Sequence, residues 1–115
     1  MPEPAAPFAL MVRFTVRAGS EEAFDALVAE TAQGIRDHEP GTLMYACHTV
    51  RDHPRQRIFY ELYRDRAAFE AHESTPHVRR FLTERRALLD ATDVDFLDCP
   101  GGKVPIVMFM GGSGA

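Results

Sequence analysis

Two of the five histidines, His72 and His77, flank an expected break between two helices at Thr75-Pro76. His72 follows Phe69 by three residues and His77 precedes Phe81 by four, so both imidazoles are expected to face the buried side of their helices. An imidazole in that place can act as a general base near neutral pH, and the free N–H groups of the second helix can hold an anion. The competing interpretation is that each is a partly buried histidine whose neighbours satisfy it.

Glu61 is expected in the middle of a strand, between aromatic residues. Burying it without a partner is costly. If its face of the sheet meets the helices, His72 or His48 is its natural partner. Such a pair would fix the tautomer of the imidazole and make it a usable base. If its face meets a second subunit, Glu61 forms an interface ion pair with Arg13 or Arg57. The sequence does not set the register of the hairpin, so both arrangements stay open.

Aromatic residues near these groups predict a pocket. Tyr45, Tyr60 and Tyr63 have apolar rings with a polar tip, which suits the wall of an aromatic site, although tyrosines in such strands are also ordinary core or interface residues. His38 and His53 stand in expected turns, where we expect solvent to surround them. The candidate catalytic residues are His72, Glu61 and His48, and the candidate substrate-binding residues are Tyr45, Tyr63, His77, Phe69 and Phe81.

Several classes of site lack sequence support. His72 and His77 are five residues apart across a break and have no Asp or Cys cluster beside them, which argues against a metal site. No glycine-rich phosphate loop follows a strand. Cys47 and Cys99 have no metal-type spacing and no activating partner, so we expect reduced thiols.

The composition indicates which classes of partner and which cellular location to expect. The net charge of −4 gives no basic excess for nucleic acid, and no run reaches the roughly 18 apolar residues that span a bilayer. The N-terminal residues MPEPAAPFALMV have an acidic residue and no basic start, which is not typical of a secretory signal. We therefore expect a cytoplasmic protein without nucleic-acid or membrane partners.

The hydrophobic pattern predicts the elements that position the candidate residues. Alternating apolar residues indicate strands, and apolar residues spaced by three and four indicate helices. The order is strand, helix, two strands, broken helix, strand, which predicts an α+β ferredoxin-like βαββαβ fold with a four-stranded antiparallel sheet. In chain order these elements are strand 8–17, a helix from Ser20 to 37–38, strands 42–50 and 57–64, helices from Asp65 to Thr75 and from Pro76 to about Asp90, and strand 94–97.

One domain, residues 8–99, is expected between two shorter pieces. Residues 1–7 contain three prolines and predict an irregular arm. Residues 100–115 form an apolar C-terminal extension whose KVPIVMFM run, at 103–110, predicts an extra strand on its own sheet or on that of a partner. Apolar residues alternate on both faces of the first three strands, so a second copy of the chain is the simplest cover for the face without helices.

The run FYELYRDRAAFEAHESTPHVRRF, preceded by EPGTLMYACHTVRD, resembles the antibiotic biosynthesis monooxygenase family over about residues 10–97. The similar features are the Pro-Gly turn before the second strand, the F-Y-E-x-Y strand, the helix that begins at an Asp, and H-x-S-x-P-H at the helix break. The resemblance implies a homodimer that forms an α+β barrel. Family members include cofactor-independent monooxygenases of phenols, small quinol monooxygenases, haem-degrading enzymes and a sugar-phosphate isomerase.

The sequence departs from two branches of the family. Haem-degrading members have a tryptophan on the short helix and an asparagine on the first strand, and polyketide-tailoring members use a similar pair. This chain has no tryptophan, and His72 occupies the corresponding place, while the place of the haem-ligating histidine falls near Leu82. These departures disfavour haem degradation, and the resemblance does not by itself imply an aromatic polyketide substrate.

Two functions follow as hypotheses. The first is a cofactor-independent monooxygenase that oxidises a small phenol or quinol to a quinone with O₂, with His72 as the base, Glu61 orienting it, and no metal or cofactor. It predicts a cavity for an aromatic ring between sheet and helices. The second is a non-oxidative member, either a small-molecule isomerase with charged anchors such as Arg13 or Arg79, or a dimeric binding module whose cavity is filled by side chains.

Overall fold

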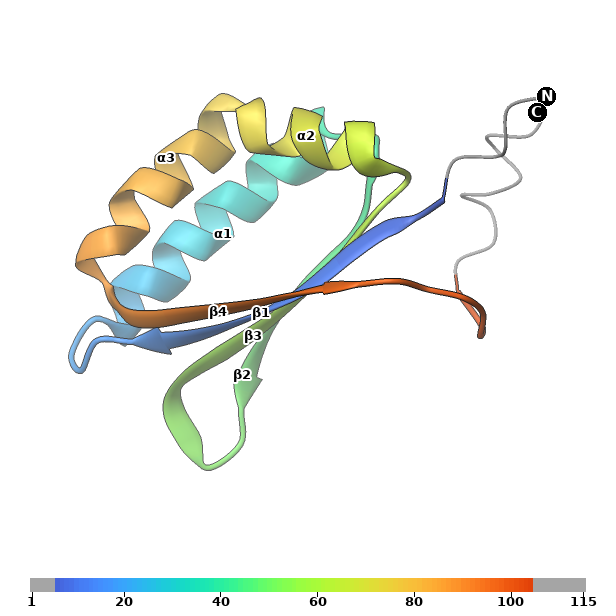
Figure 1. Ribbon diagram of the computed structural model, residues 1–115. Helices are drawn as coiled ribbons and strands as arrows, with labels where there is room; N and C mark the ends of the chain where they lie inside the picture. The colour runs from blue at the N-terminus through green and yellow to red at the C-terminus, as the bar shows by residue number, and fades with distance from the viewer. Residues whose placement is uncertain (1–5, 105–115) are drawn as a thin grey trace, which may run out of the picture.

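In the computed structural model, which describes residues 6–104, a four-stranded antiparallel sheet has all its helices on one face (Figure 1). The strand order β2-β3-β1-β4 and the βαββααβ succession confirm the predicted ferredoxin-like α+β fold. The elements are β1 (Phe8–Val16), α1 (Glu21–His38), β2 (Thr42–Val50), β3 (His53–Tyr63), α2 (Arg66–Ser74), α3 (Pro76–Glu84), a short 3₁₀ helix (Arg85–Ala87) and β4 (Leu89–Leu97).

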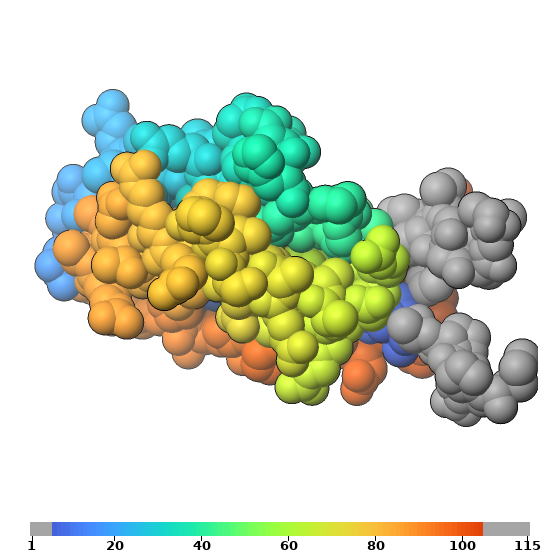
Figure 2. Space-filling view, turned by 90° about the horizontal axis from the view of Figure 1, so that it is seen from above, coloured from blue at the N-terminus to red at the C-terminus, as the bar shows by residue number. Residues whose placement is uncertain are grey.

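The core lies between the sheet and α1 and α3. Phe14 of β1, Phe24 of α1 and Phe59 of β3 are at most 1% exposed, and their rings lie against one another and against Phe81 of α3. Figure 2 shows α1 and α3 over this side of the molecule, with part of β4 visible along the edge beyond α2 and α3. The side chains of β4 that face the helices are therefore poorly covered, and Phe96 is 65% exposed.

The helix break forms as its sequence predicts. The Asp65 carboxylate accepts a hydrogen bond from the Ala68 N–H and caps α2, and Thr75 ends α2 in extended backbone. Thr75 also caps α3, whose first residue is Pro76. Proline suits that position because the first N–H groups of a helix have no partner within it. Ser20 precedes α1 as expected, but its side chain makes no capping hydrogen bond.

Three boundaries differ from the sequence prediction, and one of them is the start of β4, at Leu89 rather than Val94. β3 begins at His53 rather than Arg57, because the hairpin turns tightly at Arg51-Asp52, where Asp52 adopts a φ of 63° that aspartate tolerates. α3 ends at Glu84 rather than near Asp90, and the chain passes through the 3₁₀ helix into β4. The carbonyl of Leu88, whose spacing suggested a helix, accepts a hydrogen bond from the N–H of Arg17 beside β1.

The face of the sheet opposite the helices is apolar at its centre. Met11, Ile58 and Tyr60 lie there, and Val104 packs against a small cluster formed by Ala9 and Leu62. The extra strand predicted for residues 103–110 lies mostly outside the described residues. Within residues 6–104, no helix is long and apolar enough to cross a membrane.

Candidate active site

A cavity of about 110 Å³ lies between the helix side of the sheet and helices α2 and α3. Most of its wall is apolar, and its ionisable groups come from β2, β3, α2 and the 3₁₀ helix. It borders a larger groove at the end of α3, with which it shares Glu73, Leu82 and Arg85. The cavity is lined by Leu10, Val12, Phe14, Tyr45, Glu61, Phe69, His72, Glu73, Val78, Phe81, Leu82, Arg85, Val94 and Phe96.

The hairpin register places Glu61 inside the molecule. Glu61 pairs with Leu10 on one side and Tyr45 on the other, and all three residues line the cavity. The Glu61 side chain is 8% exposed and accepts a 2.5 Å hydrogen bond from the hydroxyl of Tyr63. Of the two arrangements left open by the sequence, the one in which Glu61 meets the helices is therefore present.

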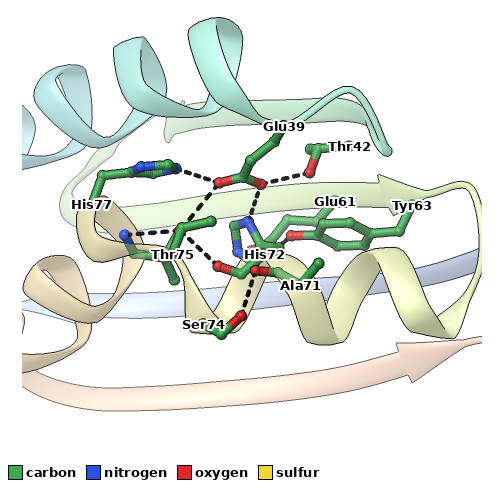
Figure 3. A network of polar contacts seen from close by, with 10 residues as sticks. Glu39, Thr42, Glu61, Tyr63, Ala71, His72, Ser74, Thr75 and His77 are labelled. Atoms are coloured by element: carbon green, nitrogen blue, oxygen red, sulfur yellow. Dashed lines mark hydrogen bonds and ion pairs between the residues drawn. The ribbon is translucent and has the colours of Figure 1, made fainter.

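His72 lies between two carboxylates (Figure 3). Its Nδ1 is 2.7 Å from Oε1 of Glu39, and its Nε2 is 3.8 Å from Oε1 of Glu61. The second distance is too long for a hydrogen bond. The imidazole is 6% exposed and packs beside Tyr45 and Tyr63. Among the described residues, His72 is therefore held on its Nδ1 side and makes no hydrogen bond on the side that faces the cavity.

Glu39, which the sequence did not single out, holds His72. It caps the C-terminal end of α1, and its carboxylate also accepts hydrogen bonds from the Thr42 hydroxyl and from Nε2 of His77. An acidic residue at a helix C-terminus is unfavourable to the helix dipole, so Glu39-Pro40 did contain a local signal of another role. Its partners on α2 and α3, however, are more than thirty residues away in the chain.

The environments of the two carboxyl groups shift their pKa values in opposite directions. Burial raises the pKa of Glu39, but hydrogen bonds from His72, Thr42 and His77 outweigh it and lower the pKa to about 2. Burial raises the pKa of Glu61, and the hydrogen bond from Tyr63 offsets this only in part. Glu39 is thus a fixed negative charge, whereas Glu61 accepts a proton more readily than an ordinary carboxylate.

Arg85 adds a positive charge to the cavity wall. Its guanidinium lies over the rings of Phe14 and Phe81, at 5.6 and 5.5 Å from their centroids. Burial lowers the pKa of Arg85, although the Tyr45 hydroxyl and the Glu61 carboxyl near it act in the opposite direction. An arginine keeps its charge under such conditions, so the cavity contains a cation that can face an oxyanion.

The other candidate residues divide into three groups. Tyr45, Phe69 and Phe81 line the cavity. Tyr63 does not line it, but its hydroxyl donates a hydrogen bond to Glu61, which does. His77 does not line the cavity and instead contacts Glu39 from the α3 side.

His48 requires a correction. It pairs with Ile58 and Arg13 lies next to Ile58 in the sheet, so all three belong to the face away from the helices. Because successive side chains of a strand point to opposite faces, Tyr45 and His48 cannot both face the cavity. The structure therefore removes His48 from the candidate site. Among residues 6–104 no cluster of His, Cys, Asp and Glu has a geometry suited to a metal ion.

Comparison with known proteins agrees with this architecture. The sequence profile named antibiotic biosynthesis monooxygenase matches residues 7–84. The solved structure of PA3566 from Pseudomonas aeruginosa is 29% identical, with a TM-score of 0.78, and the match covers 87% of this chain and all of that one. Rv0793 from Mycobacterium tuberculosis is 26% identical, with a TM-score of 0.77, over 85% and 98% of the two chains. No curated protein sequence matched. The chain belongs to the antibiotic biosynthesis monooxygenase family.

Proposed function

We propose that this protein is a cofactor-independent monooxygenase that oxidises a small phenol or quinol to a quinone with O₂. The observation that carries the proposal is the buried His72, which is held by a carboxylate at Nδ1 and faces an aromatic-lined cavity with Nε2. Such an imidazole can remove a phenol proton, which is the step that makes an electron-rich ring reactive toward O₂. Membership of the family supports the monooxygenase class.

The proposed reaction needs a base, a cation and a dry site. His72 takes the phenol proton at Nε2, and Glu61, with its raised pKa, can take up a proton next to it. Arg85 stabilises the phenolate and the negative charge that develops when the ring passes an electron to O₂. One oxygen atom then bonds to a ring carbon, the O–O bond breaks, and the other oxygen leaves as water with the two hydrogens that the substrate loses. The phenol is oxidised by the same number of electrons that reduce O₂, so no further reductant is required.

The size of the cavity restricts the substrate class. A closed apolar cavity of about 150 Å³ accommodates a benzene ring in another protein, and this cavity is about 110 Å³. A single ring is therefore the largest aromatic group that we propose for it, and it would require Leu82 or Phe96, which line the cavity, to move outward. Substituents of the ring would extend into the neighbouring groove beside Arg85 and Arg86.

The test is oxygen uptake with purified, metal-free protein and a panel of one-ring and multi-ring quinols and phenols, using ¹⁸O₂ to follow the oxygen atoms. We expect saturable uptake with one-ring substrates, one ¹⁸O atom in the quinone, and a loss of about 100-fold or more in kcat for His72→Gln. His53→Gln is the matched control, because His53 is exposed at the start of β3. Uptake no faster than autoxidation across the panel would refute the proposal.

A non-oxidative role is the second candidate, and the small cavity favours it. Side chains fill most of the space between sheet and helices, as a binding module without turnover requires. The isomerase version has less support, because neither Arg13 nor Arg79 lines the cavity. Ligand-induced thermal shifts without oxygen uptake would favour this second candidate over the first.

We also propose a second copy of this chain as the partner that covers the apolar face around Met11, Ile58 and Tyr60. The same face has Arg13 on β1 and Asp93 and Asp95 on β4, so two copies related by a two-fold axis can pair opposite charges at its margin. Sedimentation equilibrium of wild type and Tyr60→Glu tests this, with a dimer expected for the first and a monomer for the second. The cytoplasmic location expected from the sequence stays a prediction.

A further inference from the structure

We propose that Glu39 is the positioning residue of this site, which holds His72 as the Nδ1–H tautomer and so leaves Nε2 free to accept the substrate proton. The reaction in this inference rests on the proposed function, whereas the tautomer is a property of the resting protein. Glu39 lies at the end of α1, outside the sequence features that single out the α2–α3 break. It does not line the cavity, so it acts through His72.

The hydrogen bonds of Glu39 define its role. Its Oε1 lies 2.7 Å from both Nδ1 of His72 and the Thr42 hydroxyl, and its Oε2 contacts Nε2 of His77. The side chain is 5% exposed, and all these neighbours are donors to it. Figure 3 shows the carboxylate between the end of α1, the start of β2 and the α2–α3 break. A carboxylate so placed remains ionised and only accepts hydrogen bonds.

The tautomer of His72 follows from this arrangement. Since an ionised Glu39 has no proton to give, the proton in its 2.7 Å contact with His72 must belong to Nδ1. A neutral imidazole carries one N–H, so Nε2 then has a free lone pair. That nitrogen faces the cavity and Glu61. Its distance from Oε1 of Glu61, 3.8 Å, is too long for a hydrogen bond. When Nε2 receives a proton, the imidazolium lies against the Glu39 charge, which stabilises it without taking the proton.

Glu61 is not suited to the same task. Its Oε1 already accepts a hydrogen bond from Tyr63 and lies 3.8 Å from His72, so it does not fix the imidazole. It lines the cavity, whereas Glu39 lies on the opposite side of the ring. The two carboxylates therefore have separate functions, in which Glu39 holds the base and Glu61 is the group that meets substrate.

The first experiment is ¹⁵N NMR of the histidine side chains at pH 8, with signals assigned by the His72→Gln variant. We expect wild-type His72 to be neutral, with the proton on Nδ1, and Glu39→Gln to shift its ring nitrogens toward a mixture of tautomers. The control is Glu70→Gln, since Glu70 is an exposed carboxylate on the same helix as His72. A wild-type His72 with its proton on Nε2, or an imidazolium at this pH, would overturn the inference even if Glu39→Gln does not fold. A tautomer that Glu39→Gln leaves unchanged would also overturn it.

Steady-state kinetics provide the second measurement. Glu39→Gln is expected to lower kcat for the best quinol of the panel by about 100-fold with KM changed less than about threefold, because Glu39 does not line the cavity. Glu39→Asp, which restores the charge, should recover at least about tenfold of that loss. Equal losses in both variants would indicate a packing defect and refute the positioning role. Lack of uptake by wild type would refute the proposed function, and the NMR result would then decide the inference about Glu39.

Discussion

Replacing Glu39 by Gln should change how the stability of this protein depends on pH. Hydrogen bonds from His72, Thr42 and His77 outweigh the effect of burial and lower the pKa of Glu39 from 4.5 to about 2 in the folded chain. A carboxyl group with a lowered folded-state pKa stabilises the fold above its unfolded pKa, and this contribution is lost as the pH falls toward the folded value. The window of change is therefore about pH 5 to 2, and the amide of Glu39→Gln has no such contribution.

The size of the effect follows from the pKa difference. At ~1.4 kcal/mol per pH unit, a drop from 4.5 to about 2 corresponds to a stabilisation of about 3 kcal/mol at pH 7. About 2 kcal/mol of this stabilisation of the folded state is lost by pH 3. This is a substantial share of the 5–15 kcal/mol typical of a folded domain. Glu61 is present in wild type and variant alike, so its own titration largely cancels in the comparison.

The assay is urea unfolding followed by far-UV circular dichroism at pH 7, 5, 4 and 3. We expect the difference in unfolding free energy between wild type and Glu39→Gln to fall by about 2 kcal/mol from pH 7 to pH 3. Glu70→Gln, an exposed matched change, should show a constant difference from wild type. A Glu39→Gln difference that varies by less than about 0.5 kcal/mol over this range would show that His72 and His77 do not hold an ionised carboxylate.

Three further predictions concern neighbouring groups. Burial raises the pKa of Glu61, so the contribution of this group to the stability of the fold is present below the unfolded pKa of 4.5 and lost at higher pH. The urea midpoint of wild type should therefore rise relative to that of Glu61→Gln as the pH falls from 8 to 4, and a fall would contradict this. Gly34→Ala normally stabilises a helix, but here the new methyl would lie 2.5 Å from Cγ of His77, so we expect a destabilisation of about 1–3 kcal/mol in urea unfolding rather than a gain. Asp65→Ala removes the 2.8 Å cap on the Ala68 N–H and should cost about 1 kcal/mol in the same assay; an unchanged midpoint would mean that solvent replaces the cap.

The helices could be predicted because their signals, the spacing of apolar residues and the capping residues, lie within a few residues of each other in the sequence. The spacing of Phe24, Leu27 and Ile35 identified the buried side of α1, because an amphipathic helix needs only its own sequence to show that side. Asp65 and Thr75-Pro76 fixed the start of α2 and α3 through caps that reach three residues along the chain. The family resemblance then agreed with the fold that these signals predict.

The candidate site was predicted in part, because its contacts cross the fold. The sequence singled out His72 and Glu61, and both line the cavity, but their 3.8 Å separation depends on how α2 packs on β3. Glu39 was missed because its partners are 33 and 38 residues away, and only the packing of α1 against the helix break brings them together. The last strand was predicted too short, at residues 94–97, because Leu88 and Leu89 fit a helical spacing as well as a strand. The hydrogen bond from the Arg17 N–H to the Leu88 carbonyl, which decides between them, is also long-range.

The opposite environments of the two carboxyl groups are the strongest structural argument that this network is more than a means of holding helices together. A purely structural cluster needs each acid to be paired, and Glu39 alone meets that condition, since His72, His77 and Thr42 all donate to it. Within residues 6–104, Glu61 has only Tyr63 as a hydrogen-bond donor, in a cavity wall where an apolar residue would pack at lower cost. Pairs of acids whose pKa values are driven apart around one imidazole are typical of acid–base sites. Leaving Glu61 under-paired costs stability, and that cost is explained if the missing partner is a substrate hydroxyl.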